Sequence, residues 1–375
     1  MKESTQLLRS DLGMGILVVP PSAQTARAAG TGPSARLNVP KRIGSILGFR
    51  AGRRIPGWGV AVGAALAMIC AGSLRAAPFA YITNDSNNVS VIDTATNTVT
   101  ATIPVGNATI GVAVDPAGRR VFVANSGDNS VEVINVQKQR VTKTIRVGSF
   151  PEGVAVHPTG TRVYVTNNSG SSVSVISHTT RRTKVIATVQ VGVLPLGVVV
   201  NPAGTFVYVA NNGVNNSISV ISTATNTVVA TIPFGGVSGA GPAGLAINPA
   251  GTTLYATKLA GNIVSVIDTA TNTITATIGV GSLPTGIAIN PAGTRVYVAN
   301  ENSNNVSVID TATNTVIATV PVGTTPFGIA VDPAGALAYV ANNGSNNVSV
   351  IDTATNTVTA TIDVTGPEAF GLFIR

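Results

Sequence analysis

Histidine is the side chain that most often performs general acid–base catalysis near neutral pH, and this 375-residue sequence contains two. His157 stands at a turn position that the chain elsewhere fills with Asp or Asn. His178 stands at a hairpin position where another segment has Thr94. Neither lies near a sharp strand-to-helix turn of the type that presents a serine nucleophile. We therefore expect structural roles for both histidines and assign no catalytic residue.

Four aspartates recur at one position of a repeated segment: Asp93, Asp268, Asp310 and Asp352. Such repetition favours hydrogen bonds between each carboxylate and its own turn. Loops rich in Asn and Asp, such as 84–88, carry oxygen ligands that Ca²⁺ accepts, but most hold one carboxylate or none, and a tight site uses several. The Gly-rich connections precede no helix and no P-loop lysine, which argues against a phosphate site. We expect neither a metal ion nor another cofactor.

The net charge of +8 belongs to the first part of the chain. Residues 1–78 contain ten Lys and Arg against two Asp and Glu, whereas residues 79–375 contain thirteen of each. Because nucleic-acid-binding domains usually have a net positive field, the neutral body makes nucleic acid an unexpected partner. Cys70, the only cysteine, also precedes residue 79, which excludes disulfides and Cys-ligated metals from 79–375.

Residues 1–78 have the features of a leader. A basic stretch at 41–54 is followed by an apolar run at 57–72 and then by small residues, which is the order found in secretory signals. The sixteen-residue run is shorter than the roughly 20 residues that span a bilayer. We expect 57–77 to be a signal or, if it is not cleaved, a membrane anchor. The body, 79–375, is then extracytoplasmic: periplasmic, on the cell surface or secreted. The remaining alternative is that the chain is not exported.

Internal repeats determine the expected fold. Aromatic-centred segments such as VYVAN recur at spacings of 41 to 47 residues, and their aromatic residues are Tyr81, Phe122, Tyr164, Tyr208, Tyr255, Tyr297 and Tyr339. A turn of the form Asp/Asn/His-Pro-Ala/Thr-Gly precedes six of them. The segment VSVIDTATNTVTATI at 89–103 returns nearly unchanged at 264–278, 306–320 and 348–362. Repeats of about 42 residues are typical of β-propeller blades.

Each repeat predicts four short strands, because β-branched residues alternate with small polar ones between turn signals. In the unit 326–363 these strands are expected at 328–331, 337–341, 348–351 and 357–364. The body begins with a strand of the second type and ends with a solitary strand of the first type at 371–374. We therefore predict an all-β, seven-bladed β-propeller of four-stranded blades, in which the C-terminal strand joins the N-terminal blade and closes the ring.

These motifs support a family resemblance. Tyr-Val-Ala/Thr-Asn, then Asn-x-Val-Ser-Val-Ile-Asp-Thr-Ala-Thr-Asn-Thr-Val, then Pro-x-Gly-Ile-Ala-Val-Asp/Asn-Pro-x-Gly resembles the repeat of the YVTN-type β-propeller family across 79–375. The resemblance implies a secreted or surface-layer propeller. Related propellers resemble lactonases and the non-catalytic chains of quinoprotein dehydrogenases. This chain departs from the pattern at Lys258, where other repeats have Asn, and at a lengthened connection, 235–241.

The two faces of the expected propeller differ in sequence. Loops between first and second strands and between third and fourth strands nearly repeat, whereas the loops of the other face vary, and variable loops on a rigid scaffold usually carry specificity. The side chains that break the repeat there are Phe150, Glu152, Leu196, Lys258, Glu301, Phe327, Glu368 and Phe370. We expect them to line a binding surface around the channel mouth. The alternative is drift in tolerant loops.

One segment of the neutral body is strongly basic. Residues 119–184 contain ten Lys and Arg against three Asp and Glu, a net charge of +7. We expect a basic sector on two neighbouring blades, formed by Arg119, Arg120, Lys138, Arg140, Arg162, Arg181 and Arg182. It could contact anionic lipid, acidic glycan or nucleic acid, or serve only as a solvated rim. No aromatic residues are interleaved with these charges, which disfavours stacking of single-stranded bases.

The sequence as a whole favours an exported, non-enzymatic propeller that acts as a binding or cell-surface structural module through its variable loops. Its partner would be an unidentified protein, glycan or small molecule, and membrane contact would come only from an uncleaved leader. The alternative is a lactonase-like or quinoprotein-dehydrogenase-associated propeller with a site at the channel mouth. The acids available for such a site are the scattered Glu152, Glu301 and Glu368.

Overall fold

The computed structural model describes residues 79–374 except 85–86, 180–181, 237–238 and 365–368. The expected leader, with its signal or anchor at 57–77, lies outside the described residues. Within the described part of the chain, no helix combines the length and the apolar character that crossing a membrane requires.

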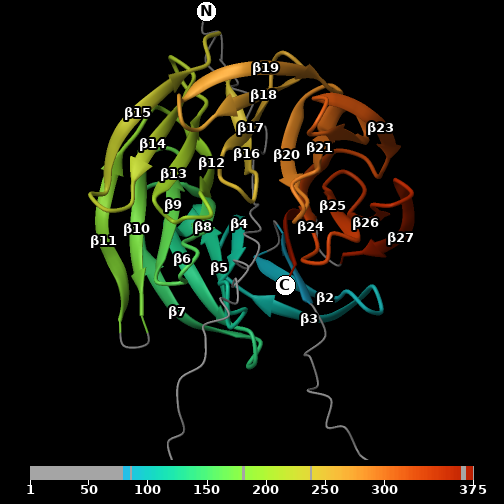
Figure 1. The fold of residues 1–375 in the computed structure, drawn as a ribbon. Helices are drawn as coiled ribbons and strands as arrows, with labels where there is room; N and C mark the ends of the chain where they lie inside the picture. Colours follow the sequence, from blue (N-terminus) through green and yellow to red (C-terminus); the bar gives the residue numbers. More distant parts are fainter. Residues whose placement is uncertain (1–78, 85–86, 180–181, 237–238, 365–368, 375) are drawn as a thin grey trace, which may run out of the picture. The chain divides into compact units, whose positions relative to one another are not determined.

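Seven antiparallel sheets of four strands form a ring (Figure 1). Blade 1 has the strand order β28-β1-β2-β3, and blades 2 to 7 take the next strands in groups of four from β4 to β27. The innermost strands contact one another around the ring, and β28 contacts both β24 and β4. These inner strands are β28 (Ala369–Ile374), β4 (Thr109–Val114), β8 (Pro151–Val156), β12 (Pro195–Val200), β16 (Pro242–Ile247), β20 (Pro284–Ile289) and β24 (Pro326–Val331).

The other three strands of each blade follow outward in chain order. The second strands are β1 (Phe79–Asn84), β5 (Arg120–Asn125), β9 (Arg162–Asn167), β13 (Phe206–Asn211), β17 (Thr253–Lys258), β21 (Arg295–Asn300) and β25 (Leu337–Asn342). The third strands are β2 (Asn88–Asp93), β6 (Ser130–Asn135), β10 (Ser172–His178), β14 (Ser217–Ser222), β18 (Ile263–Asp268), β22 (Asn305–Asp310) and β26 (Asn347–Asp352). The outermost strands are β3 (Thr98–Pro104), β7 (Arg140–Arg146), β11 (Thr183–Gln190), β15 (Thr227–Pro233), β19 (Thr273–Gly279), β23 (Thr315–Pro321) and β27 (Thr357–Asp363). Two short 3₁₀ helices, η1 (Ser126–Asp128) and η2 (Glu301–Ser303), follow second strands.

The ring closes between the two ends of the propeller. β28 pairs antiparallel with β1, so that Leu372 lies opposite Ile82 and Phe373 opposite Tyr81. The C-terminal strand therefore supplies the inner strand that the first blade lacks. This confirms the predicted seven-bladed, all-β propeller and its mode of closure, which leaves the first blade no unpaired inner edge.

The recurring aromatic residues are buried between neighbouring blades. Their exposed fractions are 3% or less. Tyr339 of blade 7 belongs to one apolar cluster with Ala80 and Ile82 of blade 1. In blade 2 the aromatic residue is Phe122, and its ring meets the ring of His178 from blade 3 edge to face, with the centroids 4.9 Å apart. His178 thus packs between two blades.

Threonine of the Tyr-Val-Thr-Asn motif bridges inner strands. Thr166 Oγ1 donates to the Leu196 carbonyl of blade 4 at 2.8 Å and accepts from Gly153 N–H of its own blade at 2.7 Å. Thr257 makes the equivalent pair of bonds from blade 5 to blade 6. The inner strands approach so closely that a Cβ at Gly153 would lie 2.4 Å from the Leu196 carbonyl oxygen, so only glycine fits there.

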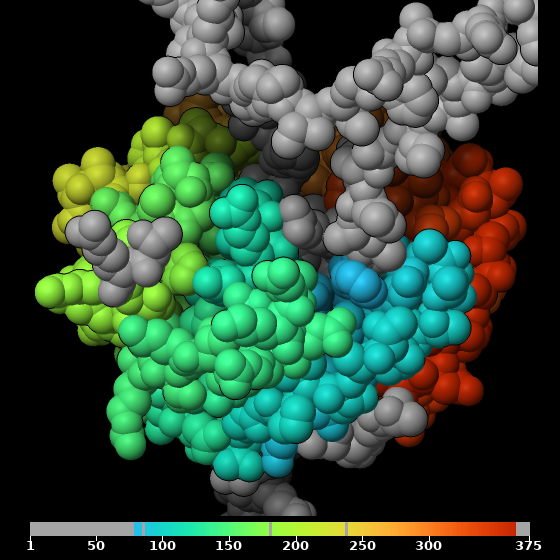
Figure 2. Space-filling model, turned by 90° about the horizontal axis from the view of Figure 1, so that it is seen from below, coloured from blue at the N-terminus to red at the C-terminus, as the bar shows by residue number. Residues whose placement is uncertain are grey.

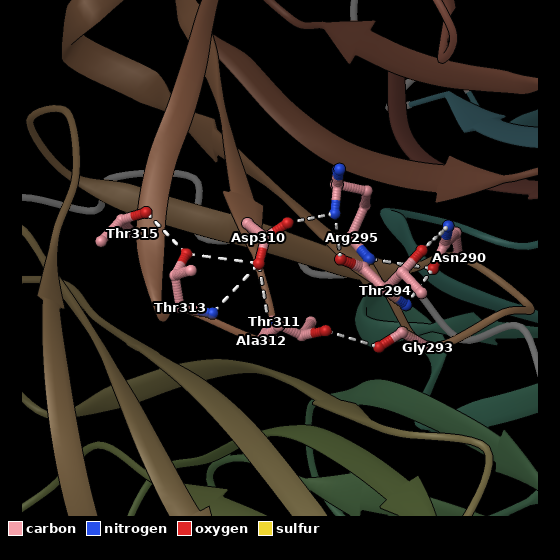
Figure 3. A network of polar contacts seen from close by, with 9 residues as sticks. All are labelled: Asn290, Gly293, Thr294, Arg295, Asp310, Thr311, Ala312, Thr313 and Thr315. Carbon is pink, nitrogen blue, oxygen red and sulfur yellow. Dashed lines mark hydrogen bonds and ion pairs between the residues drawn. The ribbon is translucent and has the colours of Figure 1, made fainter.

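Two recurring turn types meet on one face, which we call the regular face (Figure 3). Asn290 Oδ1 accepts the N–H groups of Thr294 and Arg295 across the first turn. Asp310 Oδ1 accepts the N–H groups of residues 312 and 313 in the hairpin after β22. Thr311 Oγ1 then donates to the Gly293 carbonyl at 2.8 Å and joins the two turns. These side-chain bonds explain why Asx and Thr recur, as expected for turn-stabilising groups.

Candidate functional site

The opposite face, which we call the variable face, carries the connections from one blade to the next. Five connections end at a junction residue placed directly before an inner strand, and each is a non-glycine residue with positive φ: Ala108 (51°), Phe150 (53°), Leu194 (53°), Leu283 (53°) and Thr325 (53°). The left-handed conformation costs roughly 1–2 kcal/mol for a residue with a Cβ. The neighbouring structure must therefore hold each junction residue in place.

Hydrogen bonds from both adjoining blades hold these backbones. Phe150 N–H donates to Asn129 Oδ1 of blade 2 at 2.8 Å, and the Phe150 carbonyl accepts from Asn168 N–H of blade 3 at 2.9 Å. Thr325 N–H donates in the same way to Asn304 Oδ1 at 2.8 Å. Because the bonds use backbone atoms, the junction side chain is free to vary. A set of variable side chains is thus presented on a rigid frame.

Exposed apolar side chains gather on the variable face of blades 3 and 4. Phe150 is 42% exposed, Val193 45%, Leu194 36% and Val214 65%. Gly213 N–H donates to the Val193 carbonyl at 2.9 Å, which joins the loop of Val214 to the connection of Val193 and Leu194. We call these four residues the apolar patch. Among the described residues, the other exposed large apolar side chains are Phe206, on the regular face, and six on outermost strands.

The predicted residues Leu196 and Phe327 do not lie on this open surface. They occupy the position between Pro and Gly of inner strands β12 and β24 and are 3% and 1% exposed. Both belong to one buried cluster with Ala243 and Leu259. The cluster links inner strands β12, β16 and β24 and also takes in Leu259, which follows β17.

Two of the predicted glutamates have unusual surroundings. Glu152, between Pro and Gly of β8, is 3% exposed, and burial raises its pKa well above the usual 4.5. Glu301 begins η2, and partial burial raises its pKa to about 7. In each carboxyl group Oε2 is buried without a hydrogen-bond partner among the described residues. No described residue therefore supplies a hydrogen bond to either Oε2 atom.

The two departures from the repeat, Lys258 and the lengthened connection 235–241, are related to each other. Elsewhere the motif Asn is buried, as at Asn300, whose Nδ2 donates to Asn305 Oδ1 at 2.8 Å and to Ser307 Oγ at 2.9 Å. The Lys258 side chain instead reaches the lengthened connection, where Nζ donates to the Phe234 carbonyl at 3.3 Å. Lysine and the longer connection are therefore parts of one local change.

The basic sector lies on blades 2 and 3. Arg119, Lys138, Arg140 and Arg182 are exposed, whereas Arg120 and Arg162 are half-buried. Arg162 donates to the Thr223 carbonyl of blade 4. Arg181 and Glu368 lie outside the described residues, and Phe370 lies in β28, of which only the backbone is described.

The histidines take part in the frame. His157 Nε2 lies 2.9 Å from the Gly204 carbonyl of the next blade, and Nδ1 lies 2.8 Å from Thr159 Oγ1. Within the described ranges, no three His, Cys, Asp or Glu side chains are grouped so that they could hold a metal ion.

The sequence did not single out Val193, Leu194 or Val214. A usable signal exists for one of them, since Leu194 stands before Pro195 as Phe150 stands before Pro151. For the other two, exposure depends on which side of a loop faces solvent, and the repeat pattern does not encode it.

A family model described as the choice-of-anchor I domain matches residues 110–328. No curated protein matches the chain.

Two solved structures illustrate the fold. Hydrazine synthase of Kuenenia stuttgartiensis superposes with a TM-score of 0.67 at 24% identity, over 73% of this chain and 92% of that one. A functionally unknown protein of Desulfotomaculum acetoxidans DSM 771 superposes with a TM-score of 0.68 at 17% identity, over 79% of this chain and 98% of that one. At these identities the likeness establishes the propeller fold alone.

Proposed function

The chain belongs to the choice-of-anchor I domain family, and from that premise we propose that it is an exported cell-surface propeller that binds a peptide segment of a partner protein through its variable face. Residues 57–77 act as the export signal or anchor, and the repeats are of the YVTN type. Family membership supports the surface location, since such domains are described by their anchoring.

The apolar patch is the observation that carries the binding role. An isolated exposed apolar residue is ordinary, but three on two successive connections and a fourth on a loop joined to one of them mark a contact surface. Their backbones are fixed in advance by the junction bonds, which lowers the entropy cost of binding. Aromatic residues such as Phe150 are enriched among residues that dominate interface energies.

A peptide selection tests the proposal, with a matched pair of variants as the control. Random peptides are selected on the full chain, and their affinities are then measured for Phe150→Thr and Phe206→Thr. Both positions carry Thr in another blade, at Thr325 and Thr253, so both variants should fold. The two phenylalanines are 42% and 37% exposed but lie on opposite faces.

We expect the selected peptides to bind Phe150→Thr about tenfold more weakly, the effect of losing roughly 60 Å² of apolar contact. Phe206→Thr should bind like the parent. Enrichment of no peptide, or equal losses in the two variants, would reject the variable face as the binding surface. Protease digestion of the propeller on intact cells should succeed, and full protection on intact cells would reject the surface location.

A second candidate, an enzyme site at the channel mouth, is favoured by the raised pKa of Glu152 and Glu301. Carboxyl groups with a perturbed pKa are common among catalytic acids. Turnover of lactones by the full chain that disappears in Glu301→Gln would support this candidate. Turnover that persists unchanged in that variant would reject the assignment.

A further inference from the structure

The described members of the basic sector lie at one end of blades 2 and 3, on the regular face. They occupy the turns between first and second strands, the hairpins between third and fourth strands, or the strand starts that follow: Arg119, Arg120, Lys138, Arg140, Arg162 and Arg182. Among the described acidic residues of these two blades, Asp115 is the one that lies on the regular face. Six positive charges are therefore accompanied there by one negative charge.

The turns that carry these charges are joined to one another. In blade 2 the Arg119 carbonyl accepts Val136 N–H at 3.1 Å, which connects the first turn to the hairpin before β7. Between the blades, a Cβ at Gly160 would lie 3.6 Å from Pro116 Cδ, so the first turns of blades 2 and 3 are in contact. Because the basic residues lie in turns and at strand starts, they share the end of the blades even though side chains within a strand alternate between its two sides.

An exposed aromatic side chain stands beside the basic sector. Phe206 starts β13 of blade 4 at the regular face and is 37% exposed. Phe206 is paired with Ser222, and Arg162 of blade 3 donates to the Thr223 carbonyl, so Phe206 and Arg162 adjoin the same hairpin. Among the described residues, Phe206 is the single large apolar side chain exposed on the regular face. Attachment to lipid surfaces commonly combines basic groups with such a side chain.

The charges elsewhere on the regular face have the opposite sign. The acidic side chains outside blades 2 and 3 are Asp93 of blade 1, Asp268 of blade 5, Asp310 of blade 6, and Asp332 and Asp352 of blade 7. Arg295 of blade 6 forms an ion pair with Asp310. An anionic surface therefore attracts the regular face at blades 2 and 3 and repels it at blades 5 and 7.

The described part of the chain begins at this same face. Phe79 starts β1 and is paired with Asp93, whose hairpin belongs to the regular face. Figure 2 shows the surface of blade 1, in blue and cyan, beside that of blade 2, in green. The blade that receives the chain is thus the neighbour of a basic blade.

We propose that the basic sector and Phe206 hold the regular face on an anionic membrane surface, with the variable face turned away from the membrane. This placement rests on the proposed function, in the form in which residues 57–77 stay attached as an anchor. Residues 73–78 separate the apolar run from Phe79, and six residues reach at most about 20 Å. A bilayer that holds the apolar run is therefore within reach of the regular face.

The tether favours lipid headgroups over other polyanions. A surface to which the chain is already attached is present at a high effective concentration, whereas a soluble nucleic acid or glycan must bind from bulk solution. Attraction between the basic sector and an anionic leaflet acts within a Debye length of about 10 Å, so it strengthens an existing attachment. The apolar patch then points outward, where a partner protein can reach it.

Hydrogen exchange of the full chain reconstituted into vesicles tests the proposal. The vesicles contain phosphatidylcholine alone or phosphatidylcholine mixed with phosphatidylglycerol, and flotation checks that the chain stays with the lipid. The test variant is Arg119→Thr with Arg140→Thr, and the control, at the variable-face end of the blades, is Arg146→Gln with Lys258→Asn. Each variant removes two positive charges and introduces residues that other repeats carry at these positions. Circular dichroism and thermal unfolding check that both variants fold.

We expect exchange in the blade 2 turns at 117–120 and 136–139 to be about tenfold slower in the mixed vesicles than in phosphatidylcholine alone, because the basic groups are attracted to the anionic leaflet. High salt should remove this difference. The test variant should lose most of it, and the control should keep it.

Equal exchange in the two kinds of vesicle, equal losses in the two variants, or slowing at the variable-face connections instead would overturn the proposal. Loss of the chain from the vesicles during flotation would also overturn it, because the anchor would then be absent. Peptide binding by the apolar patch is measured separately with Phe150→Thr, so failure of membrane contact and failure of peptide binding are distinguishable results.

Discussion

Replacing Thr166 by Val tests the physical reason for the Tyr-Val-Thr-Asn motif. The Thr166 hydroxyl is fully buried and joins Gly153 of blade 3 to Leu196 of blade 4. Gly153 and Leu196 each lie at a register shift of their inner strand. Neither residue is therefore paired with a residue of the second strand in its blade. Valine keeps the shape of threonine and removes the hydroxyl, leaving a buried N–H and a buried carbonyl without this partner.

The expected cost follows from these two groups. Leaving one buried polar group unsatisfied costs about 1–3 kcal/mol, so the loss of both partners in Thr166→Val should lower the free energy of unfolding by about 2–6 kcal/mol. Thr166→Ser retains the hydroxyl and should cost about 1 kcal/mol, the value of one buried methyl group. Thr166→Ala should fall between them, since the space it opens can admit a water molecule.

Urea unfolding of the full chain, followed by circular dichroism, measures these differences. The ranking parent, Ser, Ala, Val from most to least stable supports the bridging role of the hydroxyl. A Val variant within about 0.5 kcal/mol of the parent, the usual scale of a neutral substitution, would refute it. So would a Ser variant as unstable as the Val variant, since packing alone would then explain both.

Three further predictions concern the channel and the turns. Glu152→Gln should raise the melting temperature at neutral pH and have little effect near pH 4.5. The reason is that the pKa of Glu152 is raised in the folded state, so the parent protein loses stability as the pH rises from 4.5 through the folded pKa. Melting temperatures of parent and variant that change with pH in parallel would contradict this. Asp310→Asn should lower the melting temperature at neutral pH, because turn N–H groups lower the pKa of this carboxylate in the folded state. The difference should shrink as the pH falls below 3.8 and disappear below the folded pKa, where the carboxylate is protonated. A difference that stays constant in acid would speak against this reasoning. Phe327→Ala should cost about 3–5 kcal/mol in urea unfolding as a fully buried aromatic, and a loss below about 1 kcal/mol would show that Phe327 does not stabilise its buried cluster.

The architecture could be predicted because the repeats carry it. Seven aromatic-centred segments and the solitary strand at the C-terminal end determine the number of blades and the closure, since β28 takes the inner position of blade 1. The faces could be predicted as well, because recurring Asx-Pro and Thr-Ala-Thr-Asn turns fall at opposite strand ends from the variable loops.

The radial position of side chains could not be predicted in the same way. Phe150 and Glu152 are two residues apart, yet the first is 42% exposed and the second 3% exposed. The difference arises because Phe150 ends a connection in the left-handed conformation, whereas Glu152 begins an inner strand next to the axis. The sequence pattern gives the position along the repeat, but burial at the axis depends on seven strands that meet only in the folded ring.

Hydrogen exchange of the full chain with and without a selected peptide tests the central claim, that the variable face is the binding surface. The account predicts slower exchange at 147–150, 191–194 and 212–216, the segments around the apolar patch, and unchanged exchange in the regular-face turns. Protection confined to the regular-face turns, such as 290–294 and 310–314, would contradict it.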